Sequence, residues 1–353
     1  MQTYRNLYNE MCTFENLHLA FKKAEKNKRL NPHILEFERN LENELLQLKH
    51  ELETITYEPR PLKQFVIREP KTRLISASHF RDRVVHHALC NIIEPIFDKT
   101  FISDSYANRK SKGTLAAVLK FDEYKRKVSG NGRLLPCAKN NNQVFGYVLK
   151  ADIRHYFDSV DHEILMQIIS RKIRDEKVLW LIRKIMDNHC VKGKGMPIGN
   201  LTSQFFANVY LNELDYFVKH NLKAKYYIRY VDDFVILDTS KETLESYKEQ
   251  INEFLNTIKL ELHQQKSKIV PLHSGVSLLG FRVFYKYKLL KRSNVRRIPY
   301  RLQHFIELYA NGMMEKENIF ESVEGWNAYA MHGNTYKFRR SMTKKLVRCL
   351  QEK

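Results

Sequence analysis

Two adjacent aspartates, Asp232 and Asp233, lie between two short apolar runs at residues 226–230 and 234–237, and this pattern constrains the fold most. The runs predict buried strands joined by a tight turn. Such a turn normally holds Asn, Gly or Asp-Gly, which tolerate a positive φ. Adjacent carboxylates repel and raise each other's pKa unless a cation lies between them. The pattern therefore predicts a hairpin that binds metal, the alternative being a solvated turn with helix-capping aspartates.

A third aspartate, Asp152, ends another apolar run 80 residues before Asp232. In nucleotidyl transfer, carboxylates from separate elements hold two metal ions near the primer hydroxyl and the leaving pyrophosphate. Asp152 and Asp232 can meet in this way, the backbone carbonyl of Ile153 is a further candidate ligand, and Asp233 is expected to shape the site. Three other aspartates are interpreted as helix caps or surface residues: Asp158, Asp161 and Asp187.

The chain is strongly basic, with 60 Lys and Arg against 40 Asp and Glu, which indicates a polyanionic partner. The excess is concentrated at the C-terminal end. Residues 281–353 contain 16 Lys and Arg against 6 Glu, and no aspartate follows Asp238. We therefore expect a phosphate-binding surface there and no metal site, the alternative being a merely solvated basic face.

Cysteine usage and hydropathy indicate where the protein works. The five cysteines form no Cys-x-x-Cys pair and no cluster with His, which favours a reducing compartment and argues against a zinc module. The first residues lack the apolar core of a signal peptide, and no run approaches membrane-spanning length. We expect a soluble intracellular protein with no membrane partner, long enough at 353 residues for two or three lobes.

Hydrophobic periodicity predicts a mixture of helices and strands. Leu45, Leu48 and Leu52 share one face of a helix expected over residues 34–56, which packs on its own domain or, alternatively, on a partner. The other expected elements are strands at 64–68 and 73–77 around a turn at 69–72, a helix with an apolar stripe at 84–93, an exposed loop at 127–144, a strand at 145–153, helices at 161–187, 203–220 and 241–258, strands near 268–284, and basic helices at the end.

From about residue 60 to residue 290, the chain resembles the reverse transcriptases. The segment Asp152-Ile-Arg-His-Tyr-Phe157 is similar to the first catalytic motif of that family. The resemblance implies an α+β fold of the right-hand polymerase type, with fingers, a palm containing an antiparallel sheet, and a short helical thumb. The implied division is residues 1–115 for N-terminal helices and fingers, 116–275 for the palm with interleaved finger elements, and 276–353 for the primer grip and basic helical thumb.

The resemblance assigns nucleotide-binding roles to four residues. Phe157 occupies the position that guards the sugar, where a bulky ring would clash with a ribose 2′-hydroxyl and favour dNTPs; core packing is the alternative. Arg68, Lys71 and Arg73 match the triphosphate-binding motif, although an isolated basic hairpin is usually only solvated.

Other positions match motifs that contact the template, the primer or the leaving group. Residues 105–114 resemble the segment along the template, so Arg109, Lys110 and Lys112 would hold backbone phosphates. Lys266 matches a lysine that approaches the leaving phosphate and can act as a general acid. Leu279 and Gly280 resemble the primer grip.

The segment at residues 195–204 indicates a subfamily. It reads Ile198-Gly199 and Ser203-Gln204, where group II intron and retron enzymes carry Gln-Gly and Ser-Pro. This departure, and the segment at 80–96, resemble the reverse transcriptases of diversity-generating retroelements. Because apolar contacts discriminate less sharply than paired polar ones, Ile198 is expected to make copying error-prone opposite template adenines, or else only to pack under its loop. Gly199 would allow close approach to the nascent pair or serve the turn, and Gln204 would contact template or primer.

The resemblance implies an RNA-directed DNA polymerase that uses two Mg²⁺ ions, with Mn²⁺ as a substitute, and dNTPs. It would copy a template-repeat RNA into mutagenised cDNA that diversifies a target gene, with a small basic accessory variability determinant protein as partner. The implied location is the cytoplasm of a bacterium or archaeon, with a phage-encoded origin also open. The alternatives are a defence-associated reverse transcriptase and a catalytically idle RNA-binding scaffold. An intron maturase is disfavoured, because the segment after the thumb has no room for a DNA-binding or endonuclease domain and no RNase H module is evident.

Overall fold

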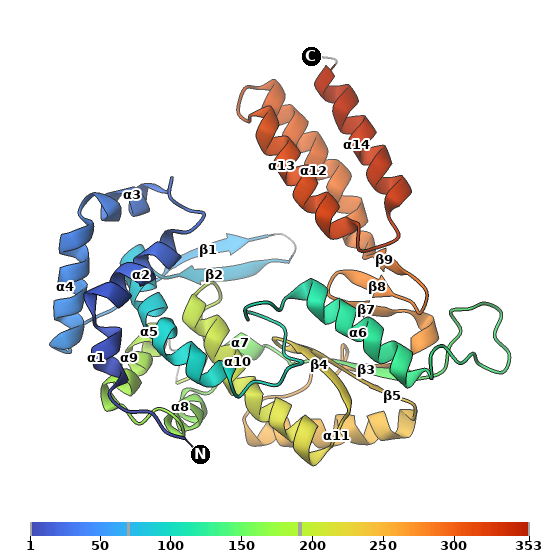
Figure 1. Ribbon diagram of the computed structural model, residues 1–353, viewed down its shortest axis with the longest axis horizontal. Helices are drawn as coiled ribbons and strands as arrows, with labels where there is room; N and C mark the ends of the chain where they lie inside the picture. Colours follow the sequence, from blue (N-terminus) through green and yellow to red (C-terminus); the bar gives the residue numbers. More distant parts are fainter. Residues whose placement is uncertain (1, 69–70, 190–192, 352–353) are drawn as a thin grey trace. The chain divides into compact units, whose positions relative to one another are not determined.

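The computed structural model describes residues 2–68, 71–189 and 193–351 (Figure 1). The chain forms two compact units that interleave along the sequence. The first unit contains Met1–Gly113, Ala151–Val235 and Ser246–Ser267, and the second contains Thr114–Lys150, Ile236–Glu245 and Lys268–Lys353. The middle of the sequence contributes to both units, and the expected division into fingers, palm and thumb stays a prediction.

The first unit is mostly helical. Its elements are α1 (Leu7–Met11), α2 (Phe14–Glu25), α3 (Pro32–Arg39), α4 (Leu41–Glu53), β1 (Lys63–Ile67), β2 (Arg73–Ala77), α5 (Phe80–Asp98), α7 (Tyr156–Ser159), α8 (His162–Ser170), α9 (Glu176–Asp187), α10 (Leu201–Tyr216), the π-helix η1 (Phe217–Asn221) and β4 (Tyr226–Tyr230).

Three elements have residues in both units: β3 (Tyr147–Asp152), β5 (Asp233–Asp238) and α11 (Lys241–Thr257). The elements of the second unit are α6 (Thr114–Val128), β6 (Lys268–Pro271), the 3₁₀ helix η2 (Leu272–Ser274), β7 (Val276–Leu278), β8 (Phe281–Val283), β9 (Lys288–Leu290), α12 (Arg292–Ala310), α13 (Lys316–Ala330) and α14 (Tyr336–Gln351).

Helix α5 forms the centre of the helical core in the first unit. Val84, Val85, Leu89 and Ile93 are completely buried, which confirms the apolar stripe predicted there. Helix α2 packs against α5. The side chain of Asn16 donates a hydrogen bond of 3.1 Å to the carbonyl of Ala88, so a polar contact as well as apolar burial joins these helices.

The single helix expected over residues 34–56 is wrong in extent, because α3 and α4 are separate helices. Asn40 lies between them with φ −123° and ψ 34°, which is outside the helical region. Leu45, Leu48 and Leu52 are nevertheless completely buried on α4, as their spacing predicts. The hydrophobic periodicity thus predicted the buried face of α4, but it did not predict the interruption at Asn40.

The single helix expected over residues 161–187 is likewise divided, into α8 and α9. The side chain of Asp175 accepts a hydrogen bond from the amide of Val178 and caps the start of α9. Asp161 caps α8 in the same way, as predicted, by accepting from the amide of Ile164. These caps define two helix starts where the apolar pattern alone suggested one helix.

A four-stranded sheet has the order β4-β5-β3-β6. Strands β3 and β6 are antiparallel, with a register from Tyr147 opposite Pro271 to Lys150 opposite Lys268. The middle of β5 is buried on both faces, so its apolar residues are consecutive and do not alternate with polar ones. Asp152 at the end of β3 and Asp233 at the start of β5 therefore lie on neighbouring strands.

Strands β1 and β2 form a separate antiparallel hairpin, as predicted, with Lys63 opposite Ala77 and Ile67 opposite Arg73. Residues 69–70 of the expected turn lie outside the described residues. Every residue of β1 is exposed, which suits a strand pair that can contact a ligand.

The C-terminal part of the second unit contains the sheet β7-β8-β9 followed by helices α12, α13 and α14 (Figure 1). Its hydrophobic core includes Ile298, Leu302, Ile319 and Leu346, contributed by all three helices. Within the described residues, no helix is both long and apolar enough to span a membrane.

Candidate active site

The turn between β4 and β5 contains Val231 and Asp232, and its backbone is strained. Val231 has φ 55°, a conformation that is unusual for a β-branched residue and costs about 1 to 3 kcal/mol. Asp232 and Asp233 are half-buried. Strain of this kind is found where the surrounding structure holds it in place, often at functional sites. The turn thus holds Val231, the residue before Asp232, in a conformation that glycine would adopt more easily.

Asp152 lies beside this turn. The amide of Ile153 donates a hydrogen bond of 3.2 Å to the carbonyl of Asp232. The pKa of Asp232 is raised to about 6, first by burial and then by the negative charges of Asp233 and Asp152, while Arg73 acts in the opposite direction. The three predicted aspartates therefore share one electrostatic environment, which the cation on β2 also influences.

Lys266 contacts the first of these aspartates. Its Nζ lies 3.0 Å from Oδ1 of Asp152. The next residue, Ser267, accepts a hydrogen bond of 3.3 Å from the amide of Asp152 and holds the end of β3 against this segment. The ammonium group therefore already lies among the candidate catalytic groups.

The donor set suits a hard divalent cation such as Mg²⁺, which prefers carboxylate and carbonyl oxygens. Among the described residues, no three His, Cys, Asp or Glu side chains gather closely enough to form a metal-binding group, and Lys266 occupies one position beside Asp152. Burial and the negative charges of Asp233 and Asp152 raise the pKa of Asp232, so a cation beside it would favour the ionised carboxylate. Asp152, Asp232 and Asp233 have the ligand chemistry of a divalent cation, which would supply the positive charge that Lys266 now brings to Asp152.

A buried ion pair supports the strained turn, and the sequence analysis did not identify it. Arg229 and Asp215 are completely buried and joined by two hydrogen bonds of 2.7 and 2.6 Å. Nη1 of Arg229 also donates to Oδ1 of Asn208 over 3.1 Å and to the carbonyl of Val231 over 3.2 Å. The pair therefore links helix α10 to the residue that precedes Asp232.

One signal in the sequence marked this pair. Arg229 is a charged residue inside the apolar run at 226–230, and Asp215 interrupts the apolar face of α10. A charge buried on a strand requires an opposite charge and further hydrogen bonds. The sequence thus indicated that Arg229 needs a partner, although it did not identify that partner.

The loop that carries Ile198 is hydrogen-bonded to β2. The carbonyl of Ile198 accepts from the amide of Ser76 over 3.1 Å. The buried side chain of Asn200 accepts from the amide of Ser78 over 3.1 Å and donates to the carbonyl of Ser76 over 3.2 Å. Asn200, which the sequence analysis did not single out, therefore fixes the position of this loop on the β1–β2 hairpin.

Gly199 is required at its position by conformation and by space. Its φ is 121°, and a Cβ atom there would lie 2.8 Å from Cγ2 of Ile75 on β2. A side chain at position 199 would therefore collide with strand β2 of the β1–β2 hairpin. Ile198 is only partly buried, so it is not simply a core residue under the loop.

The predicted sugar-guarding residue Phe157 lies on the short helix α7. Its neighbour Tyr156 is buried and donates a hydrogen bond of 2.7 Å to the carbonyl of Ala207, whereas Phe157 is half-buried. The two rings meet edge-on with centroids 5.4 Å apart. Tyr156 thus takes the core position and leaves Phe157 partly accessible.

The three cations predicted to bind triphosphate lie at the end of the β1–β2 hairpin where Ile67 pairs with Arg73. Arg68, Lys71 and Arg73 are exposed, and none of them forms an ion pair with a carboxylate of the described residues. Arg73 is close enough to lower the pKa of Asp232, as noted above. The hairpin therefore brings at least one unpaired guanidinium within electrostatic range of the aspartates.

The segment predicted to lie along the template is held by one of its own basic residues. Arg109 is only 9% exposed, and its guanidinium donates to Asp98 over 2.6 Å and to the carbonyl of Ile102 over 2.7 Å. This arginine maintains the fold of the segment, so the structure argues against the phosphate contact predicted for it. Lys110 is exposed, and the half-buried Lys112 donates to the carbonyl of Ser103.

The residues that resemble a primer grip form the turn between β7 and β8 in the second unit. Leu279 and Gly280 have φ 44° and 90°, the pattern of a type I′ hairpin turn. A Cβ atom at Gly280 would collide with the hydroxyl of Tyr329 and lie 3.3 Å from Nδ2 of Asn294. The turn is therefore fitted closely against helices α12 and α13.

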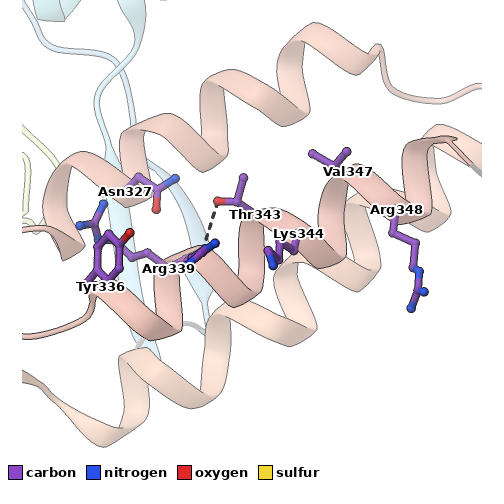
Figure 2. A pocket seen from close by; sticks show the side chains of 8 residues that line it. Asn327, Tyr336, Arg339, Thr343, Lys344, Val347 and Arg348 are labelled. Atoms are coloured by element: carbon purple, nitrogen blue, oxygen red, sulfur yellow. Dashed lines mark hydrogen bonds between the residues drawn. The ribbon is translucent and has the colours of Figure 1, made fainter.

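The C-terminal basic residues gather on one groove. Figure 2 shows Arg339, Lys344 and Arg348 of α14 along a cavity of about 560 Å³ that also borders Asn327 of α13. No carboxylate lines this cavity. The groove has the charge of the phosphate-binding surface that was expected at this end of the chain.

Comparison with known proteins gives consistent matches. A family model described as reverse transcriptase (RNA-dependent DNA polymerase) matches residues 63–283. The chain is 28% identical to Protein YkfC of Escherichia coli (strain K12), over 69% of this chain and 72% of that protein. It is 24% identical to the group II intron-encoded protein LtrA of Lactococcus lactis subsp. cremoris, over 69% of this chain and 50% of that protein.

A solved structure of telomerase from Candida albicans, in complex with a fragment of telomeric RNA, matches 84% of this chain and 57% of that chain. Its TM-score is 0.50 and its sequence identity is 12%, so this likeness concerns the fold alone. It confirms the expected α+β fold of the right-hand polymerase type. Every site residue predicted from the sequence lies within the range that the family model matches.

Proposed function

The chain belongs to the reverse transcriptase family of RNA-dependent DNA polymerases, and on this premise we propose that it copies an RNA template into cDNA by adding dNTPs to a primer. The observation that carries this proposal is the shared negative environment of Asp152, Asp232 and Asp233. Burial and these neighbouring charges together raise the pKa of Asp232, and a bound cation would stabilise the ionised carboxylates. A purely structural hairpin gains nothing from this arrangement.

The aspartates would hold two Mg²⁺ ions, with the carbonyl of Ile153 as a further ligand. When bound, these ions supply charge stabilisation at the attacking 3′-hydroxyl and at the leaving pyrophosphate. The strained Val231–Asp232 turn and the Arg229–Asp215 pair hold the carboxylates in place before substrate binds. Holding the carboxylates in place before substrate binds is favourable, because preorganised groups need no rearrangement during the reaction.

Cations of the first unit would bind the incoming nucleotide. Arg68, Lys71 and Arg73 have the charge and the exposure to hold the triphosphate. Lys266 would release Asp152 and donate the proton from its Nζ to the leaving pyrophosphate. Phe157 would exclude the 2′-hydroxyl of an NTP.

Primer extension on an RNA template tests this proposal. Asp152→Ala should abolish the extension by dNTPs that the wild-type protein performs, while Asp187→Asn, at a carboxylate that is 67% exposed, should leave it unchanged. Phe157→Ala should admit NTPs and leave dNTP use intact. Extension that persists in Asp152→Ala would exclude this site as the source of activity. If the wild-type protein binds RNA but extends no primer, the result would favour the catalytically idle RNA-binding scaffold.

We further propose that the chain is the mutagenic reverse transcriptase of a diversity-generating retroelement. It would copy a template-repeat RNA with errors opposite adenines and act with an accessory variability determinant protein. Ile198 and Gln204 support this assignment, since they replace the Gln and Pro of other families. Ile198→Gln should lower the adenine error rate of sequenced cDNA, and an unchanged rate would refute the role of Ile198.

An intron-associated reverse transcriptase is the second candidate, and the similarity to LtrA favours it. The two candidates differ in fidelity. An intron-type enzyme would copy adenines as accurately as the other bases, whereas the mutagenic enzyme would not. The error spectrum of the wild-type protein on one defined RNA therefore separates them.

A further inference from the structure

A cavity of about 360 Å³ lies between α2 and α5 in the first unit, on the side where the Ile198 loop meets the β1–β2 hairpin. We call it the α2–α5 cavity. Residues from five elements and from the segment after α2 line it: Lys23, Lys28, Arg83, His87, Ile75 and Gln204 among them. None of the site residues outside the Gly199–Gln204 segment contributes to it. This cavity therefore needs an explanation of its own.

The walls of the cavity carry positive charge without a compensating carboxylate. Lys23, Lys26, Lys28 and Arg83 line it, and neither Asp nor Glu does. Lys26 and Lys28 form no ion pair with any carboxylate in the described part of the chain. Glu25, the nearest acid in sequence, instead forms ion pairs with Lys22 and Arg29. A concave surface of this composition attracts a phosphate group.

The histidines of α5 add neutral polar groups to the same wall. Burial lowers the pKa of His86 to about 3, and burial together with the charges of Lys23 and Lys28 lowers the pKa of His87 to about 4. Each neutral imidazole has one donor and one acceptor nitrogen, a combination suited to the edge of a nucleobase. Half-buried His87 can present such a pair to a ligand.

The far side of the cavity is the segment that begins at Gly199. The half-buried Gln204 side chain makes no hydrogen bond within the part of the chain that is described, so its amide is available. Gly199 has no side chain to narrow the cavity from this side, and a Cβ atom there would collide with Ile75, which also lines the cavity. The cavity thus opens beside the loop where the nascent pair is proposed to form.

We propose that the α2–α5 cavity holds one unpaired nucleotide of the template RNA, with its phosphate facing Lys23, Lys26 and Lys28 and its base facing His87 and Gln204. This inference rests on the proposed copying function. The cavity is at the small end of the range for ligand sites, about 300 to 1,000 Å³, so it has room for a nucleotide but not for a duplex. Template that has been copied is paired, and the bound nucleotide is therefore one that has yet to be copied.

Template overhangs test this inference directly. Binding would be measured on a primer–template duplex that is blunt and on duplexes whose RNA strand extends by one or four unpaired 5′ nucleotides. The wild-type protein should bind the overhangs about tenfold more tightly than the blunt duplex. The double variant Lys26→Glu, Lys28→Glu should lose this gain and bind the blunt duplex as the wild type does. Lys225→Glu, an exposed lysine of the same unit outside the cavity, should retain the gain.

The salt dependence and an abasic overhang separate phosphate binding from base binding. Two lost phosphate contacts should reduce the slope of log affinity against log salt by about 1.4, since each contact to a single strand contributes about 0.7. Gln204→Leu should bind normal and abasic overhangs equally, whereas the wild type should prefer the normal one. These two readouts do not depend on catalysis.

Three outcomes would overturn the proposal. The double variant could keep the overhang gain, it could lose blunt and overhang binding equally, or the cavity could bind a free ribonucleoside monophosphate with the same lysine dependence while overhangs add nothing. Failure of the proposed copying function is distinguishable, because a protein that extends no primer can still show the overhang gain. Conversely, primer extension without tighter binding of overhangs would refute only the proposed role of the α2–α5 cavity in binding template.

Discussion

Arg229 donates a hydrogen bond of 3.2 Å to the carbonyl of Val231, the residue whose strained backbone leads into Asp232. The guanidinium is completely buried and paired with Asp215. Because the strain of Val231 persists only while its surroundings hold it, the buried pair is the support of the catalytic turn. This relationship leads to the first prediction.

Arg229→Met should destabilise the protein by about 3 to 5 kcal/mol, since it leaves the carboxylate of Asp215 buried without a partner. Denaturant unfolding measures the loss. The double variant Arg229→Met, Asp215→Leu should recover most of the stability, because no unpaired charge remains, but it should not recover primer extension. Arg171→Met, which breaks the exposed pair with Glu213, should cost less than about 1 kcal/mol. Equal losses in the buried and the exposed variants would contradict this account.

Asp232→Asn should stabilise the metal-free protein at pH 7. The pKa of Asp232 rises from 3.8 to about 6 on folding, so the contribution of its protonated form is complete below pH 3.8 and is lost as the pH rises through 6. The variant should gain about 2 kcal/mol at pH 7, less than the full conversion because the group is partly exposed, and nothing below pH 4. Thermal midpoints in chelator at both pH values measure this difference. A stability gain at pH 4 equal to that at pH 7 would show that the raised pKa of Asp232 is not the cause.

Lys266→Met should lower both the Mg²⁺ requirement and the maximal rate of primer extension. Because Nζ of Lys266 lies 3.0 Å from Asp152, its removal should lower the Mg²⁺ concentration that gives half-maximal extension. The maximal rate should fall by about 10²-fold, the usual loss when a general acid is removed. Lys259→Met, which removes the partner of Asp161, should change neither quantity. An unchanged Mg²⁺ requirement would show that the lysine does not compete for this carboxylate.

Gly280→Ala should destabilise the second unit by about 1 to 3 kcal/mol, because it forces a positive φ on alanine and places a Cβ against Tyr329. The resulting shift of the turn should also weaken primer binding. Gly325→Ala on α13 is a matched control, since nothing lies within 4 Å of its added Cβ and alanine favours the helix. That control should be neutral or stabilising, so destabilisation by both variants would point to a general sensitivity of the helices.

The catalytic residues could be predicted from the sequence because their signal is local. Adjacent aspartates inside an apolar hairpin are unusual whatever surrounds them, and the strands beside them follow the expected runs. The Arg229–Asp215 pair could not be predicted as a pair, since it joins an α10 residue to a β4 residue through tertiary packing. Arg109 was misjudged for a related reason, because a sequence shows its charge but not the Asp98 carboxylate that binds it.

The spacing of apolar residues also did not predict where the helices begin and end. Side-chain caps and single backbone angles decided them, as at Asp175 and Asn40. The lysines of the α2–α5 cavity gave no signal in the sequence. Lys23, Lys26 and Lys28 are ordinary surface residues until α5 and the Gly199 segment are placed against them.

The most direct test of the account is single-turnover extension of a labelled primer on an RNA template with dNTPs and Mg²⁺, by the wild-type protein and by Asp232→Ala. The account predicts rapid extension by the wild type and a loss of at least about 10³-fold in Asp232→Ala, with primer–template binding unchanged. Extension by Asp232→Ala within tenfold of the wild-type rate would contradict the central claim that the Val231–Asp232 turn is the site of DNA synthesis.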